Sequence, residues 1–319
     1  MTALLLSLAL LPGAAQAPTL WVSNERAGTL TVIDTATDRM VATVAVGGRP
    51  RGIQASPDGR TVYVAVSRPA NARPGAPEGI VAVDAASRRV RARFAAGTDP
   101  EQFAVGRDGA HLYASNEDAG TTSVTDLATG KVISTLVVGI EPEGVAVSPD
   151  GRWVYVTAET SNTVTVIDTR SNTVVASFLV DARPRAATFS PDGRRAWVTA
   201  ELGQTVSLVD TKRHAVLRSI PLDRSARPCG VVTSLDGRKL YVAAGRGDRV
   251  IVLDASSGKV TATVPVGSRV WGIVLSPNGR KLYAANSLSN DVSVIDTKTN
   301  RVIATVAVGD GPWGLTIVP

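Results

Sequence analysis

Short apolar segments alternate with polar turns along the whole chain, and the same order of segments returns again and again. The last complete unit contains four such segments, at 271–276, 282–285, 292–295 and 302–308. Val, Ile and Thr are frequent in these segments, whereas Gly, Pro, Asn and Asp occupy the turns between them. Because no segment beyond the first residues has a helical period, the pattern predicts an all-β protein.

Each unit ends its third segment with an aspartate, best seen in the phrase Val-Ser-Val-Ile-Asp-Thr at 292–297. These residues are Asp34, Asp84, Asp126, Asp168, Asp210, Asp254 and Asp296, with spacings of 50, 42, 42, 42, 44 and 42 residues. A period near 42 residues matches one four-stranded blade of a propeller. A closed ring of blades removes the open sheet edges at which proteins aggregate. The repeat therefore predicts seven blades.

The two ends of the chain are expected to build one blade together. After the first residues, the chain begins on a second-strand phrase at 20–23 and lacks a first strand of its own. Residues 313–318 repeat the first-strand phrase and are not followed by a second strand. The sequence thus predicts a seven-bladed β-propeller of four-stranded antiparallel blades, closed by a blade shared between the N- and C-terminal strands.

Residues 1–17 have the features of a secretory signal peptide. The apolar stretch at 3–11 is too short to span a bilayer, and Ala15-Gln-Ala17 is a small-residue cleavage site. We expect the remaining residues, 18–319, to form a single seven-bladed propeller domain in the periplasm, without insertion into the membrane.

Composition and charge narrow the class of partner. The hydrophobic share of 44% and the charged share of 19% are typical of a folded globular protein. The formal net charge is +6, but the arginines are spread over separate turns and are not clustered with aromatic residues. This pattern favours a solvated surface over a nucleic-acid partner. The single cysteine, Cys229, is either a reactive thiol or a small residue at a variable position, and we favour the second interpretation.

The turns from each fourth strand into the next first strand vary most, and they should meet at one mouth of the channel that the first strands line. They contribute two rings of residues. The first ring is Arg49, Asp99, Glu141, Arg183, Arg227, Arg269 and Gly311. The second ring is Arg51, Glu101, Glu143, Arg185, Cys229, Trp271 and Trp313.

This mouth is the predicted ligand-binding site. Its candidate residues are Arg49, Arg51, Glu101, Glu143, Arg183, Arg185, Arg227, Arg269, Trp271 and Trp313. The loops between second and third strands emerge on the same face and add the secondary candidates Glu25, Glu117, Glu159 and Glu201. The longest of these loops carries the insertion 68–78, whose role the sequence leaves open.

Two kinds of chemistry fit such a mouth. Guanidinium groups hold carboxylates or phosphates through paired hydrogen bonds, and tryptophan rings stack on planar groups. Alternatively, the opposite charges pair with one another and fill the tunnel. No catalytic constellation is found, so no catalytic residue is predicted. A hard-cation site built from the four secondary candidates is disfavoured by the competing arginines, and no metal is predicted.

The strand phrases Trp-Val-Tyr-Val-Thr at 153–157 and Leu-Tyr-Val-Ala-Ala at 240–244 resemble the repeats of YVTN-type seven-bladed β-propellers. The ordered turns, from Arg-Pro-Arg-Gly at 49–52 through Glu-Pro-Glu-Gly at 141–144 to Arg-Val-Trp-Gly at 269–272, are similar to those of periplasmic propeller proteins associated with pyrroloquinoline quinone-dependent alcohol catabolism. The resemblance implies a periplasmic accessory protein with no catalytic residue to transfer. It names pyrroloquinoline quinone as a candidate ligand and a periplasmic quinoprotein dehydrogenase or cytochrome as a candidate partner.

Two hypotheses of function remain. The favoured one is a non-enzymatic binding protein that holds an anionic small molecule or a partner protein at its charged mouth. The alternative is a lactonase-like hydrolase that uses mouth carboxylates with or without a divalent cation. The identity of the ligand and the oligomeric state stay open.

Cleavage after Ala17 is the first testable prediction, because the Ala-Gln-Ala site follows a short apolar run. Mass spectrometry of the exported protein should give a chain that begins at Pro18. Recovery of an exported chain with an intact Met1 would refute it.

Overall fold

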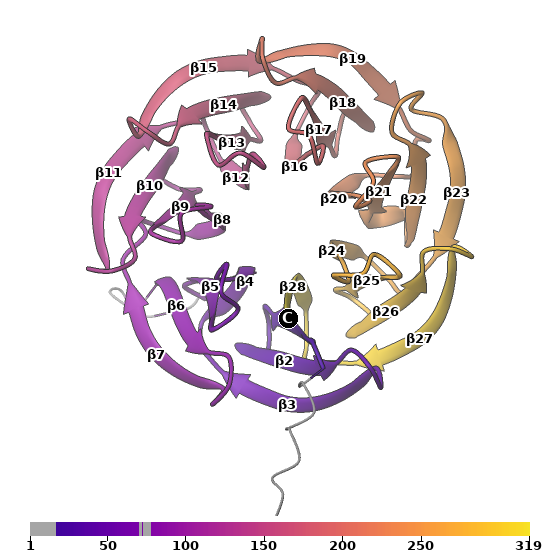
Figure 1. Cartoon of the computed structure of the whole chain (residues 1–319), viewed down its shortest axis with the longest axis horizontal. Coiled ribbons are helices and arrows are strands. Elements are labelled where there is room, and N and C mark those ends of the chain that lie inside the picture. Colours follow the sequence, from indigo (N-terminus) through magenta and orange to yellow (C-terminus); the bar gives the residue numbers. More distant parts are fainter. Residues whose placement is uncertain (1–16, 70–71, 73–77) are drawn as a thin grey trace, which may run out of the picture.

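Seven four-stranded antiparallel sheets form a closed ring in the computed structural model, which describes residues 17–69, 72 and 78–319 (Figure 1). The predicted seven-bladed propeller is confirmed. Within the described residues the one helical element is a 3₁₀ turn, η1 (Gly245–Gly247), and no helix is long and apolar enough to cross a membrane. Most of the predicted signal peptide and of the insertion 68–78 lies outside the described residues.

Six blades use four consecutive strands each. The first three of them are β4 (Arg49–Ala55), β5 (Thr61–Ser67), β6 (Gly79–Asp84) and β7 (Arg89–Phe94); β8 (Pro100–Val105), β9 (His111–Asn116), β10 (Thr121–Asp126) and β11 (Lys131–Val137); and β12 (Pro142–Val147), β13 (Trp153–Ala158), β14 (Thr163–Asp168) and β15 (Thr173–Leu179). The next three are β16 (Pro184–Phe189), β17 (Arg195–Ala200), β18 (Thr205–Asp210) and β19 (Ala215–Pro221); β20 (Pro228–Thr233), β21 (Lys239–Ala244), β22 (Arg249–Asp254) and β23 (Val260–Pro265); and β24 (Val270–Leu275), β25 (Lys281–Asn286), β26 (Asp291–Asp296) and β27 (Arg301–Ala307).

The seventh blade joins the two ends of the chain, as predicted. Its strands lie in the order β28 (Pro312–Val318), β1 (Thr19–Asn24), β2 (Thr29–Asp34) and β3 (Arg39–Ala45). β28 pairs with β1 in antiparallel register, with Leu20 opposite Ile317. The ring is therefore closed by backbone hydrogen bonds between the first and last strands of the chain.

A large aromatic residue at the third position of every second strand fills the space between blades. The residues are Trp21, Tyr63, Tyr113, Tyr155, Trp197, Tyr241 and Tyr283, all at most 9% exposed. Tyr155 of one blade packs against Phe189 of the next, with ring centroids 4.7 Å apart. Because buried aromatic rings contribute a large apolar area, these contacts hold neighbouring blades together.

The outer strands have little to pack against. Ile133 on β11 and Ile303 on β27 are 51% and 53% exposed, whereas second and third strands are buried along most of their length. The second and third strands therefore form the core of each blade, and the outer strands expose apolar side chains at the rim of the disc.

Deleting residues 312–319 should lower stability sharply, because the ring would open and β1 would lose its partner. We expect a melting temperature reduced by about 10 °C or more, or no soluble protein. Deleting Pro319 alone, an exposed residue beyond the strand, is the control and should leave melting almost unchanged. Equal melting of both truncations would contradict the closure.

Candidate functional site

Five first-ring residues hold the left-handed backbone conformation immediately before a first strand. They are Asp99, Glu141, Arg183, Arg227 and Arg269, with φ between 46° and 60°. This conformation is uncommon for side chains other than glycine, asparagine and aspartate, and it costs free energy at each position. The turn is held by side chains of the preceding blade: the Arg269 N–H donates to Asp248 at 2.7 Å and the Arg183 N–H donates to Asn162 at 2.8 Å.

Backbone hydrogen bonds bring the loop glutamates above the first ring. The N–H of Glu117 donates to the Asp99 carbonyl at 3.1 Å, and the N–H of Glu159 donates to the Glu141 carbonyl at 2.8 Å. Glu201 and Glu25 make the equivalent bonds in their blades. The same contact in four blades therefore sets the four secondary candidates beside the candidates of the first and second rings.

Hydroxyl groups of the second strands position the second ring across blade boundaries. Ser115 donates to the carbonyl of Glu143 in the next blade at 2.7 Å, and Thr157 donates to the carbonyl of Arg185 at 3.1 Å. Ser23 donates in the same way to the carbonyl of Arg51. Arg51, Glu143 and Arg185 are thus fixed both by their own blades and by the preceding ones.

Arg51 is the centre of one ion-pair cluster. Its guanidinium contacts Glu101, lies 3.1 Å from Glu25, 3.7 Å from Glu117 and 4.0 Å from Asp99. Arg49 adds a bond of 2.6 Å to Glu25. Burial opposes ionisation of Glu25, but Arg51 and Arg49 outweigh it and hold the pKa of Glu25 below its usual value.

Arg185 is the centre of a second cluster. Its guanidinium contacts Glu159 and lies 2.6 Å from Glu201 and 3.3 Å from Glu143. Arg183 adds contacts to Glu159 and Glu201. The four secondary candidates therefore divide between two arginine-centred clusters and do not form one ligand set for a cation.

The remaining sector of the mouth is aromatic. Trp271 and Trp313 lie with ring centroids 5.8 Å apart, and the guanidinium carbons of Arg185 and Arg269 lie 5.1 Å and 5.0 Å from the Trp271 ring. In the part of the chain that the structure describes, Arg269 has no carboxylate within ion-pair distance. Its positive charge is available to a ligand.

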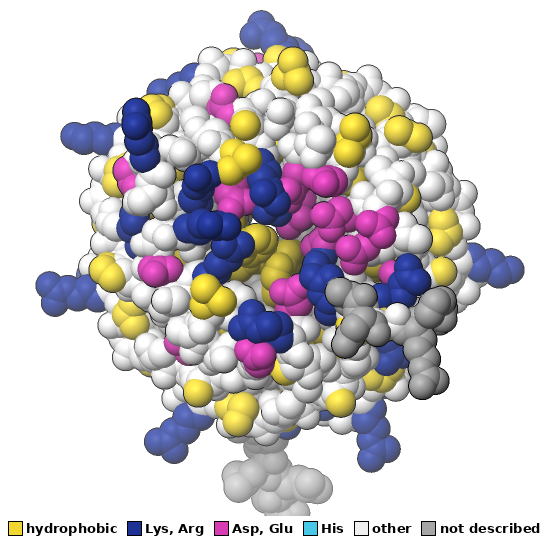
Figure 2. Space-filling view, turned by 180° about the vertical axis from the view of Figure 1, so that it is seen from behind, with side chains coloured by type: hydrophobic (Ala, Val, Ile, Leu, Met, Phe, Trp, Pro, Cys, Tyr) yellow, Lys and Arg dark blue, Asp and Glu magenta, His cyan; other side chains and the backbone are white. Residues whose placement is uncertain are grey.

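A pocket of about 360 Å³ lies between the two clusters and the aromatic sector. Acidic and basic side chains gather on different sides of this hollow (Figure 2). Of the sequence candidates, the lining includes Arg51, Glu101, Glu143, Arg183, Arg185, Arg269, Trp271, Trp313, Glu25, Glu117 and Glu159. Arg49 and Glu201 stand behind this lining, joined to it by their ion pairs, whereas Arg227 has no ion pair with any described residue.

Three lining residues were missed by the sequence analysis, namely Arg26, Ser287 and Leu288. Arg26 donates to the Ser287 carbonyl at 2.7 Å and to Asp310 at 2.8 Å, across the boundary between two blades. The repeat gave no signal for it, because Arg26 and Asp310 belong to opposite ends of the chain. Their proximity follows from ring closure.

Carboxylates outnumber guanidinium groups within the two arginine-centred clusters, which bring seven carboxylates together with four arginines. Two of these acids have a raised pKa. Burial, with a further contribution from Glu143, raises the pKa of Glu117 to about 7. Burial also raises the pKa of Glu143 in spite of Arg185 beside it. Solvent reaches Glu117 more easily than Glu143. The side chain of Glu117 is 29% exposed, whereas Glu143 is almost fully buried.

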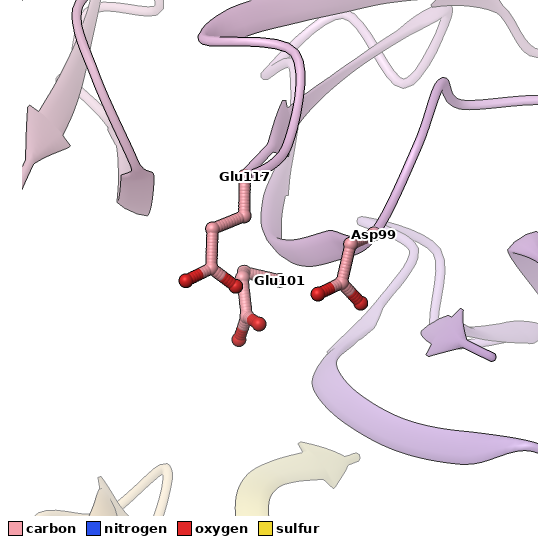
Figure 3. A group of neighbouring side chains, drawn as sticks. All are labelled: Asp99, Glu101 and Glu117. Carbon is pink, nitrogen blue, oxygen red and sulfur yellow. The ribbon is translucent and has the colours of Figure 1, made fainter. Parts of the chain in front are cut away.

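Asp99, Glu101 and Glu117 point toward one another from one blade (Figure 3), with ligand oxygens within 4.8 Å. Oxygen ligands of this type suit Mg²⁺ or Ca²⁺. The Arg51 guanidinium contacts all three groups and already supplies a cation at this position.

Cys229 occupies the second ring but is 2% exposed. Burial raises the pKa of its thiol to about 12, which keeps it in the unreactive thiol form. Its place is that of a small buried residue.

Two families match successive halves of the sequence. The family described as Choice-of-anchor I domain matches residues 14–178, and the family described as Lactonase, 7-bladed beta-propeller, matches residues 180–307. Curated proteins gave no match.

Solved structures share the fold over nearly the whole chain. Hydrazine synthase of Kuenenia stuttgartiensis is 25% identical, with a TM-score of 0.78, covering 88% of this chain and 92% of that one. A putative 6-phosphogluconolactonase of Bacteroides uniformis is 19% identical, with a TM-score of 0.80, covering 95% and 100%. The periplasmic gluconolactonase PpgL of Pseudomonas aeruginosa is 22% identical, with a TM-score of 0.78, covering 95% and 99%. The two lactonase structures are less than 25% identical to this chain, so their likeness shows the fold alone.

The raised pKa of Glu117 predicts a pH-dependent stability difference between the wild type and Glu117→Gln. The folded state holds the Glu117 proton more tightly than the unfolded chain does, so this contribution to stability is present below pH 4.5 and is lost as pH rises through about 7. Glu117→Gln should therefore melt about 2–4 °C above the wild type at pH 8 and gain less at pH 5. An equal difference at both pH values would contradict the raised pKa.

Proposed function

The chain belongs to the Choice-of-anchor I domain family, and we propose that it is a lactonase-like hydrolase that opens a cyclic ester at its charged mouth. The match of residues 180–307 to the lactonase propeller family supports this reaction class over passive binding. The observation that carries the proposal is Glu117, a carboxyl group with a pKa of about 7 that faces a pocket lined with arginines.

Glu117 is suited to act as the general base. A base with a pKa near the working pH is ionised often enough to accept a proton and still basic enough to take it from water. Its carboxylate would remove a proton from a water molecule in the pocket while the water oxygen attacks the lactone carbonyl carbon. The fixed position of its backbone, bonded to the Asp99 carbonyl, holds this group at the mouth.

The arginines would stabilise the charge that develops. Attack places a negative charge on the former carbonyl oxygen, and Arg269, free of carboxylate partners among the described residues, is the guanidinium of the pocket best placed by charge to receive it. The ring C–O bond then breaks, and the leaving alkoxide takes the proton that Glu117 holds. The product is an open hydroxy acid, which loses its acidic proton to solvent at neutral pH.

Other mouth carboxylates are less suited to this role. Arginines hold the pKa of Glu25 and Glu201 below their usual value despite burial, so both are weak bases. Glu143 lines the pocket but is only 5% exposed and lies 3.3 Å from Arg185, so it presents little surface to a water molecule. The proposal therefore depends on one residue and not on the acidity of the mouth as a whole.

Hydrolysis of gluconolactone and of 6-phosphogluconolactone by the purified protein tests the proposal. The rate should rise with pH through about 7, as Glu117 loses its proton. Glu117→Gln should lower kcat by about 100-fold or more, since general-base catalysis contributes that much. Asp118→Asn, which changes the exposed neighbouring carboxyl, is the matched control and should retain activity.

Equal activity in the wild type and Glu117→Gln would exclude Glu117 as the base. Absence of turnover of several lactones by the wild type would exclude the hydrolase and favour the second candidate function.

That second candidate is a periplasmic binding protein for a planar anion, linked to pyrroloquinoline quinone-dependent alcohol oxidation. The paired Trp271 and Trp313 rings beside Arg269 favour it. Pyrroloquinoline quinone should then quench tryptophan fluorescence saturably and raise the melting temperature. The candidate partner is a periplasmic quinoprotein dehydrogenase or cytochrome.

A further inference from the structure

The two ends of the propeller carry charges of opposite kinds. All eight glutamates of the chain lie on the mouth face: Glu25, Glu78, Glu101, Glu117, Glu141, Glu143, Glu159 and Glu201. All six lysines lie on the opposite face, in or beside its turns: Lys131, Lys212, Lys239, Lys259, Lys281 and Lys298. We call this second end, made by the first-to-second and third-to-fourth strand turns, the turn face. Thirteen aspartates also lie in or beside the turns of this face, including the seven that end the third strands. Its six lysines and thirteen arginines outnumber them, so the turn face keeps a positive net charge.

A ring of six exposed arginines surrounds the centre of the turn face. Every turn between a first and a second strand within one blade contributes one member: Arg60, Arg107, Arg152, Arg194, Arg238 and Arg280. Only Arg60 and Arg152 have a carboxylate within ion-pair distance among the described residues, at 3.9 Å and 3.6 Å. The guanidinium groups of the other four are free to meet an external anion.

The aspartates of four of these turns accept hydrogen bonds from the backbone N–H groups of the arginines and not from their guanidinium groups. Asp58, Asp150 and Asp192 each accept the backbone N–H of the arginine two residues later, at 3.0–3.1 Å. Asp236 does the same for Arg238, and Asn278 for Arg280. One carboxylate oxygen of each aspartate is thus bonded to the turn backbone, while the arginine side chains are exposed.

The shape of the array favours a planar partner over a linear one. The six arginines come from the first-to-second turns of six of the seven blades, with further bases in the third-to-fourth turns. In the described part of the chain, these turns hold no continuous track of exposed aromatic residues. Trp153, the aromatic residue beside this ring, is covered by Arg152 at 4.3 Å and by His214. A single-stranded nucleic acid would need a groove with open aromatic faces, whereas an anionic lipid surface attracts many bases at once.

We propose that the turn face docks on an anionic phospholipid bilayer as a peripheral surface. Leu235, which is 59% exposed, lies in the same turn as Arg238 and would enter the headgroup layer. In this orientation the mouth points away from the membrane and stays open to solutes. The proposal does not depend on the reaction at the mouth.

Co-sedimentation with vesicles tests the docking. The mature protein should bind vesicles of phosphatidylcholine and phosphatidylglycerol in equal parts and should not bind vesicles of phosphatidylcholine alone. Binding should weaken as salt is raised, because the charges are exposed. The double variant Arg194→Glu/Arg280→Glu should bind at least about tenfold more weakly.

A matched control separates the face from total charge. Arg224→Glu/Arg246→Glu makes the same change of charge at exposed positions of the mouth face and should bind as the wild type does. Melting curves of both variants establish that each is folded. Equal loss of binding in both, equal binding to neutral vesicles, or no binding at low salt would overturn the proposal. Retention on heparin or single-stranded DNA without vesicle binding would overturn it in favour of a linear polyanion.

Discussion

The close approach of neighbouring first strands is the constraint on which the rest of the structure depends. Gly144 and Gly272 lie so near the next blade that a Cβ atom would come within 2.2 Å of the Arg185 carbonyl and 2.5 Å of the Trp313 carbonyl. Glycine therefore allows backbone to pack on backbone around the axis. Since the second-ring residue stands immediately before this glycine, the same contact brings side chains from different blades together at the mouth.

That convergence explains the electrostatics of the pocket. Arg51 and Arg185 each form ion pairs with carboxylates of their own or adjacent blades, and the paired groups are largely buried. Breaking such a cluster by removing one partner is costly, so the pairs stabilise the mouth as well as shape it. In clusters where carboxylates outnumber guanidinium groups, a carboxyl group without a full partner has a raised pKa. Glu117 is such a group and is also exposed to the pocket. Structural ion pairing and a base of near-neutral pKa thus arise from one arrangement.

The repeat also separates the two ends of the molecule. Because strands alternate direction, a residue type favoured in one kind of turn is repeated on one face only. In five blades an arginine follows the glycine of the turn between the first and second strands, and these arginines surround the centre of the turn face. They are Arg60, Arg152, Arg194, Arg238 and Arg280. The loops of the opposite face vary more in sequence, which gives the mouth its distinct acidic, basic and aromatic sectors.

The blade count, the strand order and the closing pairing of the two ends follow from the amino-acid sequence, because a period of about 42 residues with fixed turn chemistry admits few other folds. It also placed the turns that carry the candidate site residues on one face, since strand alternation dictates which turns share an end. The tertiary structure alone decided which charges meet. Arg51 pairs with Glu25 and Glu101 from both neighbouring blades, and Arg26 reaches Asp310 only because the ring closes. The proton affinity of Glu117 depends on burial and on the distances to Glu143 and Arg51, and such three-dimensional quantities leave no mark in the repeat.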